Sequence, residues 1–182
     1  MRVAVDTDNT ICDTLAVLRR CLRIPLVAEQ SRDWSPYGAD AAFWERYGGD
    51  VFEAAQPYFG APEAMGVMAR RAGVAYVTAR PASAASVTAR WLRRHGFPDG
   101  LMIFDCAADK PLAAKRLGCL WAIEDDPCQI EAYRTSGIPV LVPRRAYNLQ
   151  AGGADLFEEW YEVLMRLPRS LEAGVHPAGC QS

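Results

Sequence analysis

Two aspartates, Asp6 and Asp8, directly follow a short apolar segment near the N-terminus, residues 3–5. Side chains two positions apart point to the same side of an extended chain, so both carboxylates can converge on one ligand. The alternative is structural, because aspartates at the end of a strand also form turns and cap helices. The polar residues that follow the other apolar segments decide between these two interpretations.

Charged and hydroxyl-bearing residues follow two further apolar segments. The second segment ends at Thr78 and is followed by Arg80, and the acidic residues 124–126 come after the fourth segment. The chain has two lysines: Lys110 opens a predicted helix, whereas Lys115 lies mid-helix and is expected to be a solvated surface charge. Ligands of an open parallel sheet bind beyond the carboxyl ends of its strands, so we expect these groups to meet at one edge.

Short apolar segments alternate with longer helical patterns, which predicts an α/β fold built on a doubly wound parallel sheet. The expected strands cover residues 3–5, 74–78, 101–104, 120–123 and 138–142. The expected helices cover about residues 82–95, 111–117, 127–136 and 155–167. A glycine past the end of each of the first three helices supports these boundaries.

The interval between the first two strands is too long for a single crossover. It contains one amphipathic helix, with Leu15 and Leu18 on its apolar side, and two short helical patterns at about 41–47 and 50–59, the second opening on a capping box at Asp50. We therefore predict a small helical cap at 14–60, inserted into a core of residues 1–13 and 61–168. Residues 169–182 are expected to form a poorly ordered tail.

The order of these motifs resembles the four motifs of the haloacid dehalogenase-like (HAD) superfamily of phosphohydrolases, over about residues 1–150. Longer segments look like its nucleotidase branch, akin to 5′(3′)-deoxyribonucleotidases: residues 77–81, 91–98, 110–118, 123–127 and 143–148. The resemblance implies a Rossmannoid core with a cap and the hydrolysis of phosphate monoesters. Asn9 departs from the family, which usually has glycine there, but asparagine tolerates a left-handed backbone better than most residues.

The resemblance also implies roles for the two aspartates. Asp6 would attack phosphorus and form an aspartyl-phosphate, while Asp8 would protonate the leaving alkoxide and then deprotonate the hydrolytic water. To donate a proton at neutral pH, Asp8 needs a pKa above the ordinary value of about 3.9, which crowding by other carboxylates can produce.

A phosphate dianion among several carboxylates is repelled unless a cation is present, and Mg²⁺ suits such a set of oxygen ligands. The resemblance gives the metal ligands as Asp6, the backbone carbonyl of Asp8, and Asp125, with Glu124 or Asp126 contributing through water. Asp126 has a strong structural alternative, because it is also placed to cap the helix that follows it.

Contacts to the phosphate are implied at four positions: Thr78, Ala79, Arg80 and Lys110. Thr78 would donate a hydrogen bond to a phosphate oxygen. Lys110 stands 14 residues before Glu124, as in the nucleotidase branch, and is the candidate ammonium group. For Arg80 two interpretations stay open, a substrate contact and a bridge that holds the loop.

Composition narrows the class of protein. The 182 residues are 51% apolar and fit one ordinary domain, and a net charge of −2 without a run of like charges gives no basic footprint for nucleic acid. No apolar stretch approaches about 18 residues, so we expect no membrane partner and a cytoplasmic location.

The six cysteines include no C-x-x-C pair, which favours reduced thiols. The C-x5-R spacing at Cys128 lies in a helical pattern, unlike that of a cysteine phosphatase.

Aromatic residues are concentrated between residues 34 and 59. Most would form the core of the cap, but one or two could face the active site and stack on a nucleobase. Trp34, Trp44 and Tyr47 are the first candidates, because they are large rings with a polar group.

The expected function is therefore that of a Mg²⁺-dependent phosphomonoesterase acting on a small-molecule phosphate ester, with a nucleotide as the first choice. Three alternatives remain open: a phosphatase of sugar phosphates or other small metabolites, a phosphatase of nucleic-acid termini, and a non-catalytic phosphate-binding or receiver module. A receiver domain normally has a single acceptor aspartate and no long insertion, so the pair Asp6 and Asp8 disfavours it. The sequence does not indicate an oligomeric state.

Overall fold

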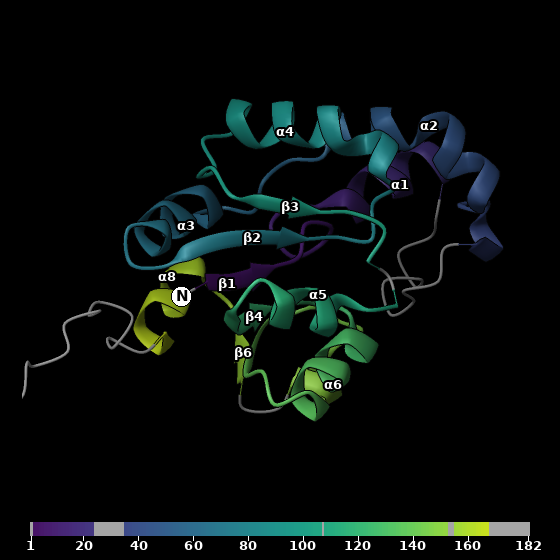
Figure 1. The fold of residues 1–182 in the computed structure, drawn as a ribbon. Helices are drawn as coiled ribbons and strands as arrows, with labels where there is room; N and C mark the ends of the chain where they lie inside the picture. The colour runs from purple at the N-terminus through teal and green to yellow at the C-terminus, as the bar shows by residue number, and fades with distance from the viewer. Residues whose placement is uncertain (1, 24–34, 107, 153–154, 168–182) are drawn as a thin grey trace, which may run out of the picture.

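The computed structural model describes residues 2–23, 35–106, 108–152 and 155–167 (Figure 1). In this part of the chain, six parallel strands form one sheet in the order β3-β2-β1-β4-β5-β6. The strands are β1 (Arg2–Val5), β2 (Gly73–Val77), β3 (Leu101–Ile103), β4 (Cys119–Ile123), β5 (Val140–Pro143) and β6 (Leu156–Phe157). The chain runs outward from β1 in both directions, so the predicted doubly wound α/β fold is confirmed.

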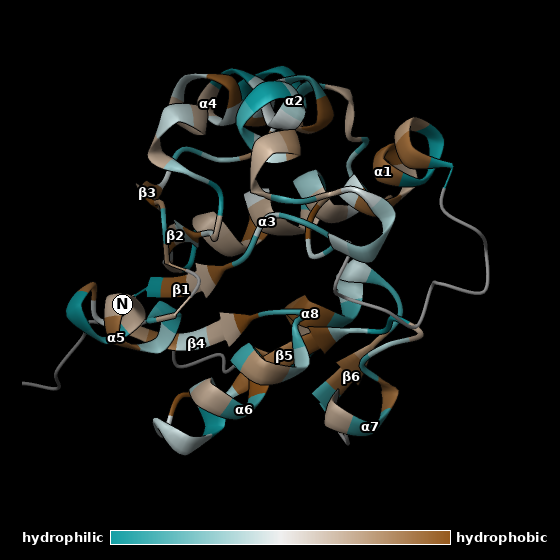
Figure 2. Ribbon diagram, turned by 90° about the vertical axis from the view of Figure 1, so that its right-hand side faces the viewer, coloured by the Kyte–Doolittle hydropathy of each residue, from teal (hydrophilic) through white to brown (hydrophobic). Residues whose placement is uncertain are grey.

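Helices cover both faces of the sheet, because successive side chains of a buried strand point to opposite faces. The helices are α1 (Thr14–Leu22), α2 (Ala41–Ala54), α3 (Ala61–Ala69), α4 (Ala85–Arg94), α5 (Lys110–Arg116), α6 (Pro127–Thr135), α7 (Leu149–Gly152) and α8 (Trp160–Arg166). Val3 and Val5 pack in a hydrophobic cluster with α1, α2, α3, α4 and α8. Ala4 points the other way, into a cluster with α5 and α6, which lie together on the opposite face (Figures 1 and 2).

The helix α2 is continuous, where the sequence predicted two short helices separated at a glycine pair. A Cβ atom on Gly48 would lie 3.5 Å from the rings of both Trp44 and Phe52, so glycine here permits close packing of the helix and does not end it. The two rings stack with centroids 5.7 Å apart. Asp50 lies inside the helix, so the predicted capping box at Asp50 is wrong.

The predicted helix at 155–167 is wrong in its first part. Leu156 and Phe157 form β6 beside β5, and α8 begins only at Trp160. A capping box between Glu159 and Glu162 fixes this start, since each side chain accepts a hydrogen bond from the other residue's backbone. The helices α3 and α7 were not predicted from the sequence. For α3 a signal was present, because Pro62 lies in its first turn.

The predicted cap is not separated from the core by its packing. Val17 and Leu18 of α1 and Val51 of α2 belong to the same hydrophobic cluster as Val3 and Val5 of β1. The boundaries at 14–60 remain a prediction, and the predicted disordered tail at 169–182 lies outside the described residues. Within the described ranges, no helix has the length and apolar character needed to cross a membrane.

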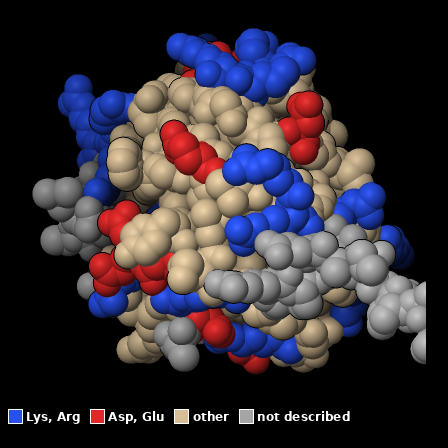
Figure 3. Space-filling model, turned by 90° about the vertical axis from the view of Figure 1, so that its left-hand side faces the viewer, with Lys and Arg blue, Asp and Glu red and all other residues tan. Residues whose placement is uncertain are grey.

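Basic and acidic side chains occur together on the face that carries the amino ends of the strands (Figure 3). The basic groups at the top of this view lie over the end of α4, whose last turn contains Arg93 and Arg94. The residues expected to do chemistry follow the carboxyl ends of the strands, at the opposite edge of the sheet (Figure 1).

Candidate active site

The loop after β1 carries both aspartates and is held by hydrogen bonds to its neighbours. The backbone N–H of Asp6 donates to the carbonyl of Ile123 at 3.0 Å. Asn9 adopts the left-handed conformation that asparagine tolerates, with φ of 57°. Its side-chain oxygen accepts a hydrogen bond from the Leu15 N–H at 2.9 Å, which ties the loop to the start of α1.

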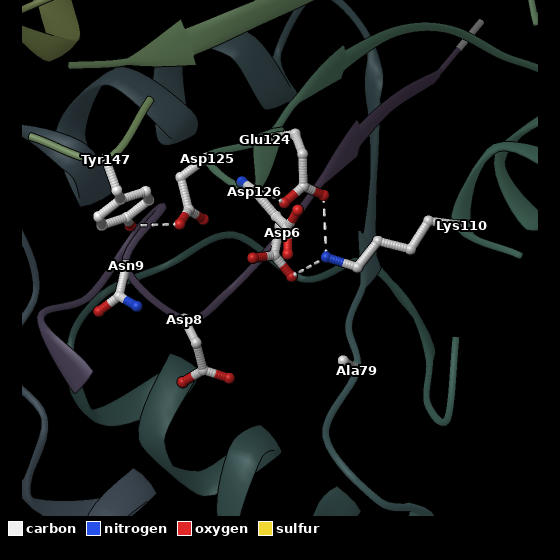
Figure 4. A pocket seen from close by; sticks show the side chains of 9 residues that line it. All are labelled: Asp6, Asp8, Asn9, Ala79, Lys110, Glu124, Asp125, Asp126 and Tyr147. Carbon is white, nitrogen blue, oxygen red and sulfur yellow. Dashed lines mark hydrogen bonds and ion pairs between the residues drawn. The ribbon is translucent and has the colours of Figure 1, made fainter. Parts of the chain in front are cut away.

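Lys110 joins two of the acids (Figure 4). Its Nζ lies 2.7 Å from Oδ1 of Asp6 and 2.8 Å from Oε2 of Glu124, and all three side chains are buried. Burial disfavours the charged form of Lys110, but the two carboxylates outweigh it and raise its pKa well above the ordinary value. The predicted ammonium group is therefore in the site, whereas Lys115 is exposed.

Asp125 lies on the other side of Asp6 and is held by two hydroxyl groups. Thr10 Oγ1 donates to Asp125 Oδ1 at 2.5 Å. Tyr147 Oη donates to Asp125 Oδ2 at 2.5 Å (Figure 4). The side-chain amide of Asn148 donates to the Asp125 carbonyl at 3.0 Å. Burial, and then the charge of Asp6, raise the pKa of Asp125 to about 7.

Asp6, Glu124 and Asp125 form an acidic cluster, with one carboxylate oxygen of each within 4.8 Å of the others. If all three ionise, the single ammonium of Lys110 leaves two negative charges uncompensated. Burial accordingly raises the pKa of Asp6 and of Glu124. A donor set made only of oxygen atoms fits a hard divalent cation such as Mg²⁺.

Glu124 and Asp126, on either side of Asp125, have mainly structural partners. Both carboxylate oxygens of Glu124 are engaged, one by Lys110 Nζ and the other by the backbone N–H of Asp126 at 3.1 Å. The Asp126 side chain accepts the backbone N–H groups of Cys128 and Gln129, so the structural alternative for Asp126, the N-cap of α6, is present.

Asp8 is paired with Arg80 in a bidentate ion pair. Arg80 donates from Nε to Asp8 Oδ2 at 2.9 Å and from Nη2 to Oδ1 at 2.7 Å, and Thr14 Oγ1 donates to Oδ1 at 2.5 Å. Burial would raise the pKa of Asp8, but Arg80 outweighs burial and lowers it. The expectation of a raised pKa for Asp8 is therefore wrong in this arrangement, because a guanidinium and not a carboxylate is its nearest charged neighbour.

Arg80 has the geometry of a bridge and not of a free substrate contact. Its guanidinium is buried, also donates to Thr88 Oγ1 at 3.1 Å, and lies 4.1 Å from the centroid of the Phe52 ring. Of the two interpretations left open for Arg80, the structure contains the bridge. It links the loop after β1 to α4 and α2.

The Thr78 hydroxyl is buried and does not line the acidic cavity. It lies 2.7 Å from the Thr7 hydroxyl and accepts the backbone N–H of Arg80 at 3.2 Å. Ala79, the next residue, is exposed and lines the site.

Two adjoining cavities open at this edge of the sheet. The acidic cavity, of about 160 Å³, is lined by Asp6, Asp8, Asn9, Ala79, Lys110, Glu124, Asp125, Asp126 and Tyr147 (Figure 4). The cap-side cavity, of about 660 Å³, shares Asp8, Asn9 and Ala79 with it and continues along α1 and α2 to Leu18, Trp44, Glu45 and Phe52.

The three candidate aromatic residues differ in position. Trp44 lines the cap-side cavity, whereas Tyr47 does not line it and is 44% exposed. Trp34 lies outside the described residues.

Three residues that hold the acids were missed by sequence reasoning. Thr10, Tyr147 and Asn148 were given no role, although Tyr147 and Asn148 belong to a segment that resembles the nucleotidase branch. Their signal was weak, because neither a hydroxyl four residues after Asp6 nor a Tyr-Asn pair after β5 indicates a contact to Asp125 by itself.

The fold and the site define an α/β protein with an acidic cluster at the carboxyl edge of a doubly wound parallel sheet. More particularly, the chain has the HAD-like fold. A HAD-like family hydrolase from Streptococcus pneumoniae is similar to this chain with a TM-score of 0.65 at 16% identity, over 90% of this chain and 96% of that one. No protein-family model and no curated protein matched the sequence.

Two further solved structures have the same fold. A HAD family hydrolase from Deinococcus radiodurans R1, with bound phosphate and sodium, aligns with a TM-score of 0.64 at 13% identity, over 89% of this chain and 92% of that one. An L-2-haloacid dehalogenase aligns with a TM-score of 0.63 at 14% identity, over 92% of this chain and 100% of that one.

Proposed function

We propose that this chain is a Mg²⁺-dependent phosphomonoesterase that acts through an aspartyl-phosphate on Asp6. The observation that carries the proposal is the acidic cluster itself: a buried aspartate with an ammonium at 2.7 Å and two more carboxylates around an open cavity. With its three carboxylates ionised and Lys110 charged, this set carries two net negative charges, which one divalent cation would compensate so that a phosphate could approach.

In the proposed reaction, an Asp6 carboxylate oxygen forms a bond to phosphorus while the ester P–O bond breaks. Lys110 faces the same carboxylate and neutralises charge on the transferred group. Asp6, Asp125 and the backbone carbonyl of Asp8 would hold Mg²⁺, which supplies charge compensation for the phosphate oxygens. Glu124 keeps Lys110 in position, since both of its oxygens already have partners.

Asp8 would carry the proton in both half-reactions, first to the leaving oxygen and then from the attacking water. Its pairing with Arg80 lowers its pKa in the substrate-free site. The negative charge of an arriving phosphate acts in the opposite direction and favours the protonated form. As a carboxylate, Asp8 is already in the charge state needed to accept a proton from water.

The leaving group would occupy the cap-side cavity. With about 660 Å³ and the Trp44 ring in its wall, this cavity has the size and the aromatic surface to take a nucleoside. We therefore propose nucleoside monophosphates as substrates. A sugar phosphate would fill less of this cavity and would leave the aromatic surface without a stacking partner.

The test is a phosphate-release assay with nucleoside monophosphates, pentose phosphates and p-nitrophenyl phosphate, in Mg²⁺ and in excess chelator. We expect turnover in Mg²⁺ only. Equal turnover in chelator would contradict the Mg²⁺ requirement, and equal efficiency for nucleotides and bare pentose phosphates would reduce the proposal to a general small-molecule phosphatase. Halide release from a 2-haloacid, with no phosphate release from any ester, would assign the site to dehalogenation.

A further inference from the structure

A third cavity, of about 270 Å³, adjoins the acidic cavity, and Tyr147 lines both. Its charged lining consists of three arginines, Arg19, Arg144 and Arg145, with one acid, Asp13. Asp13 is already engaged as the N-cap of α1, where it accepts the Ala16 N–H at 2.8 Å. The formal charges of its lining residues sum to plus two, and Glu158, which pairs with Arg144 from outside the lining, reduces this to plus one.

Arg145 is held in position without being neutralised. Its Nε donates to the Asn9 carbonyl at 2.9 Å, its Nη1 donates to the Arg144 carbonyl at 2.9 Å, and its guanidinium lies 3.9 Å from the centroid of the Tyr58 ring. These contacts hold the guanidinium group in place, but all of its partners are neutral. No carboxylate among the described residues lies within ion-pair distance of Arg145.

The guanidinium of Arg144 can exchange its present partner for another anion. Its partner is Glu158, at 3.2 Å, and the two side chains are 53% and 68% exposed. An ion pair this exposed contributes little and is easily replaced by another anion. A fixed guanidinium beside an exchangeable one is a suitable arrangement for a tetrahedral oxyanion, which accepts hydrogen bonds from several N–H groups at once.

We infer that Arg144 and Arg145, with Arg19 at the rim, form a binding site for a phosphate-like oxyanion, distinct from the acidic cavity. The anion has two possible sources, a free ion such as phosphate or sulfate and a second anionic group on a ligand whose first phosphate lies in the acidic cavity. Binding of the free ion requires neither Asp6 nor a metal, whereas the second source rests on the proposed function.

The first experiment measures sulfate binding by calorimetric titration in excess chelator, at constant ionic strength set with chloride. Without a divalent cation, the acidic cavity repels anions, so saturable binding reports the arginine cavity. Each lost charge-assisted hydrogen bond should weaken binding at least about tenfold, and we expect this for both Arg144→Gln and Arg145→Gln. Arg90→Gln is the matched control, because Arg90 is an exposed, ion-paired arginine that lines none of the three cavities.

The second experiment separates the two sources, with Mg²⁺ present. If the anion is part of the substrate, Arg144→Gln should raise KM for a nucleoside 3′,5′-bisphosphate and leave KM for the 5′-monophosphate unchanged. If the anion is a free ion, sulfate should change the KM of the monophosphate in the wild type but not in Arg144→Gln.

The inference is overturned if the wild type shows no saturable sulfate binding, or if Arg144→Gln and Arg90→Gln bind sulfate as tightly as the wild type. Arg145 also holds the Asn9 carbonyl, so Arg145→Gln could fail to fold. In that case Arg144→Gln decides the result, with Arg144→Lys expected to restore part of the affinity.

Discussion

The acidic cavity and the cap-side cavity share Asp8, Asn9 and Ala79 but are built in different ways. The acidic cavity is formed by short segments after β1, β2, β4 and β5 and by the start of α5, and six of its nine lining side chains have a charged or hydroxyl partner within 3 Å. The cap-side cavity is formed by α1, α2 and the loops after β1 and β2, and the two helices line it with apolar and aromatic groups such as Leu18, Trp44 and Phe52.

This difference assigns the chemical step to the acidic cavity and the choice of leaving group to the cap-side cavity. The acidic cavity constrains a ligand by charge and by fixed hydrogen bonds, which suits one phosphate group and a cation. The cap-side cavity constrains a ligand by size and by stacking, which suits many leaving groups with different affinities. Substitutions in the first should therefore affect every substrate, and substitutions in the second should affect only substrates that reach it.

The largest effect is expected for Asp6→Asn, which removes the proposed nucleophile. Turnover should fall by at least about 10,000-fold for nucleotides and for p-nitrophenyl phosphate alike, since both depend on the same attacking oxygen. Steady-state rates with both substrates are the measurement. A loss restricted to nucleotides would contradict the division between the two cavities.

The next largest effect is expected for Lys110→Met. Removing the ammonium should lower kcat by about 100- to 1,000-fold for all substrates, because charge on the transferred group loses its fixed counter-charge. The variant should also melt at a lower temperature in chelator, since Asp6 and Glu124 lose their common partner. Lys115→Met is the control, because Lys115 is exposed on the same helix and should leave both quantities unchanged.

A smaller and selective effect is expected for Trp44→Ala. Loss of one stacking surface is worth about 1–3 kcal/mol, so kcat/KM for nucleoside monophosphates should fall about 5- to 150-fold. Efficiency with p-nitrophenyl phosphate should change little. Tyr47→Ala is the matched control on the same helix, since Tyr47 is largely exposed and does not line the cavity. Equal losses with both substrates would show that Trp44 acts only through packing.

The smallest effect concerns stability of the metal-free protein. Burial raises the pKa of Asp6 and Glu124, and raises that of Asp125 from 3.8 to about 7, so the folded state binds more protons than the unfolded state in this window. Stability in chelator should therefore fall as pH rises from about 4 to about 7. Thermal melts should show a decrease of a few degrees that Mg²⁺ reduces. Asp8, with its lowered pKa, contributes stability that is lost only at more acidic pH.

The sheet was predictable because its buried strands are short, continuous apolar segments, and the polar residues after them mark the active edge. Lys110 was identified in the same way, since only two lysines were available. The helix break predicted at Gly48 was wrong because of packing inside α2, between residues four positions apart. Gly48 looks like a helix break until the rings of Trp44 and Phe52 are seen against it.

The charge state of Asp8 was unpredictable because it depends on a contact between distant segments. In the sequence, Asp8 lies close to another carboxylate. Its nearest charged neighbour is nevertheless Arg80, because the loop after β2 directs the Arg80 guanidinium toward Asp8. Tyr147 reaches Asp125 across 22 positions of the sequence, and no local pattern gives that distance.

Asn9 determines when the loop after β1 loses its conformational entropy. Its N–H donates to the Cys12 carbonyl at 2.7 Å, its carbonyl accepts from Arg145, and its side-chain oxygen accepts from Leu15, so one left-handed residue pins the whole loop that carries both aspartates. The loop's conformational freedom is lost when the protein folds and not when a substrate arrives. Glycine at this position would keep the backbone geometry but return part of that freedom, so ordering the loop would then weaken substrate binding and raise KM more than it lowers kcat.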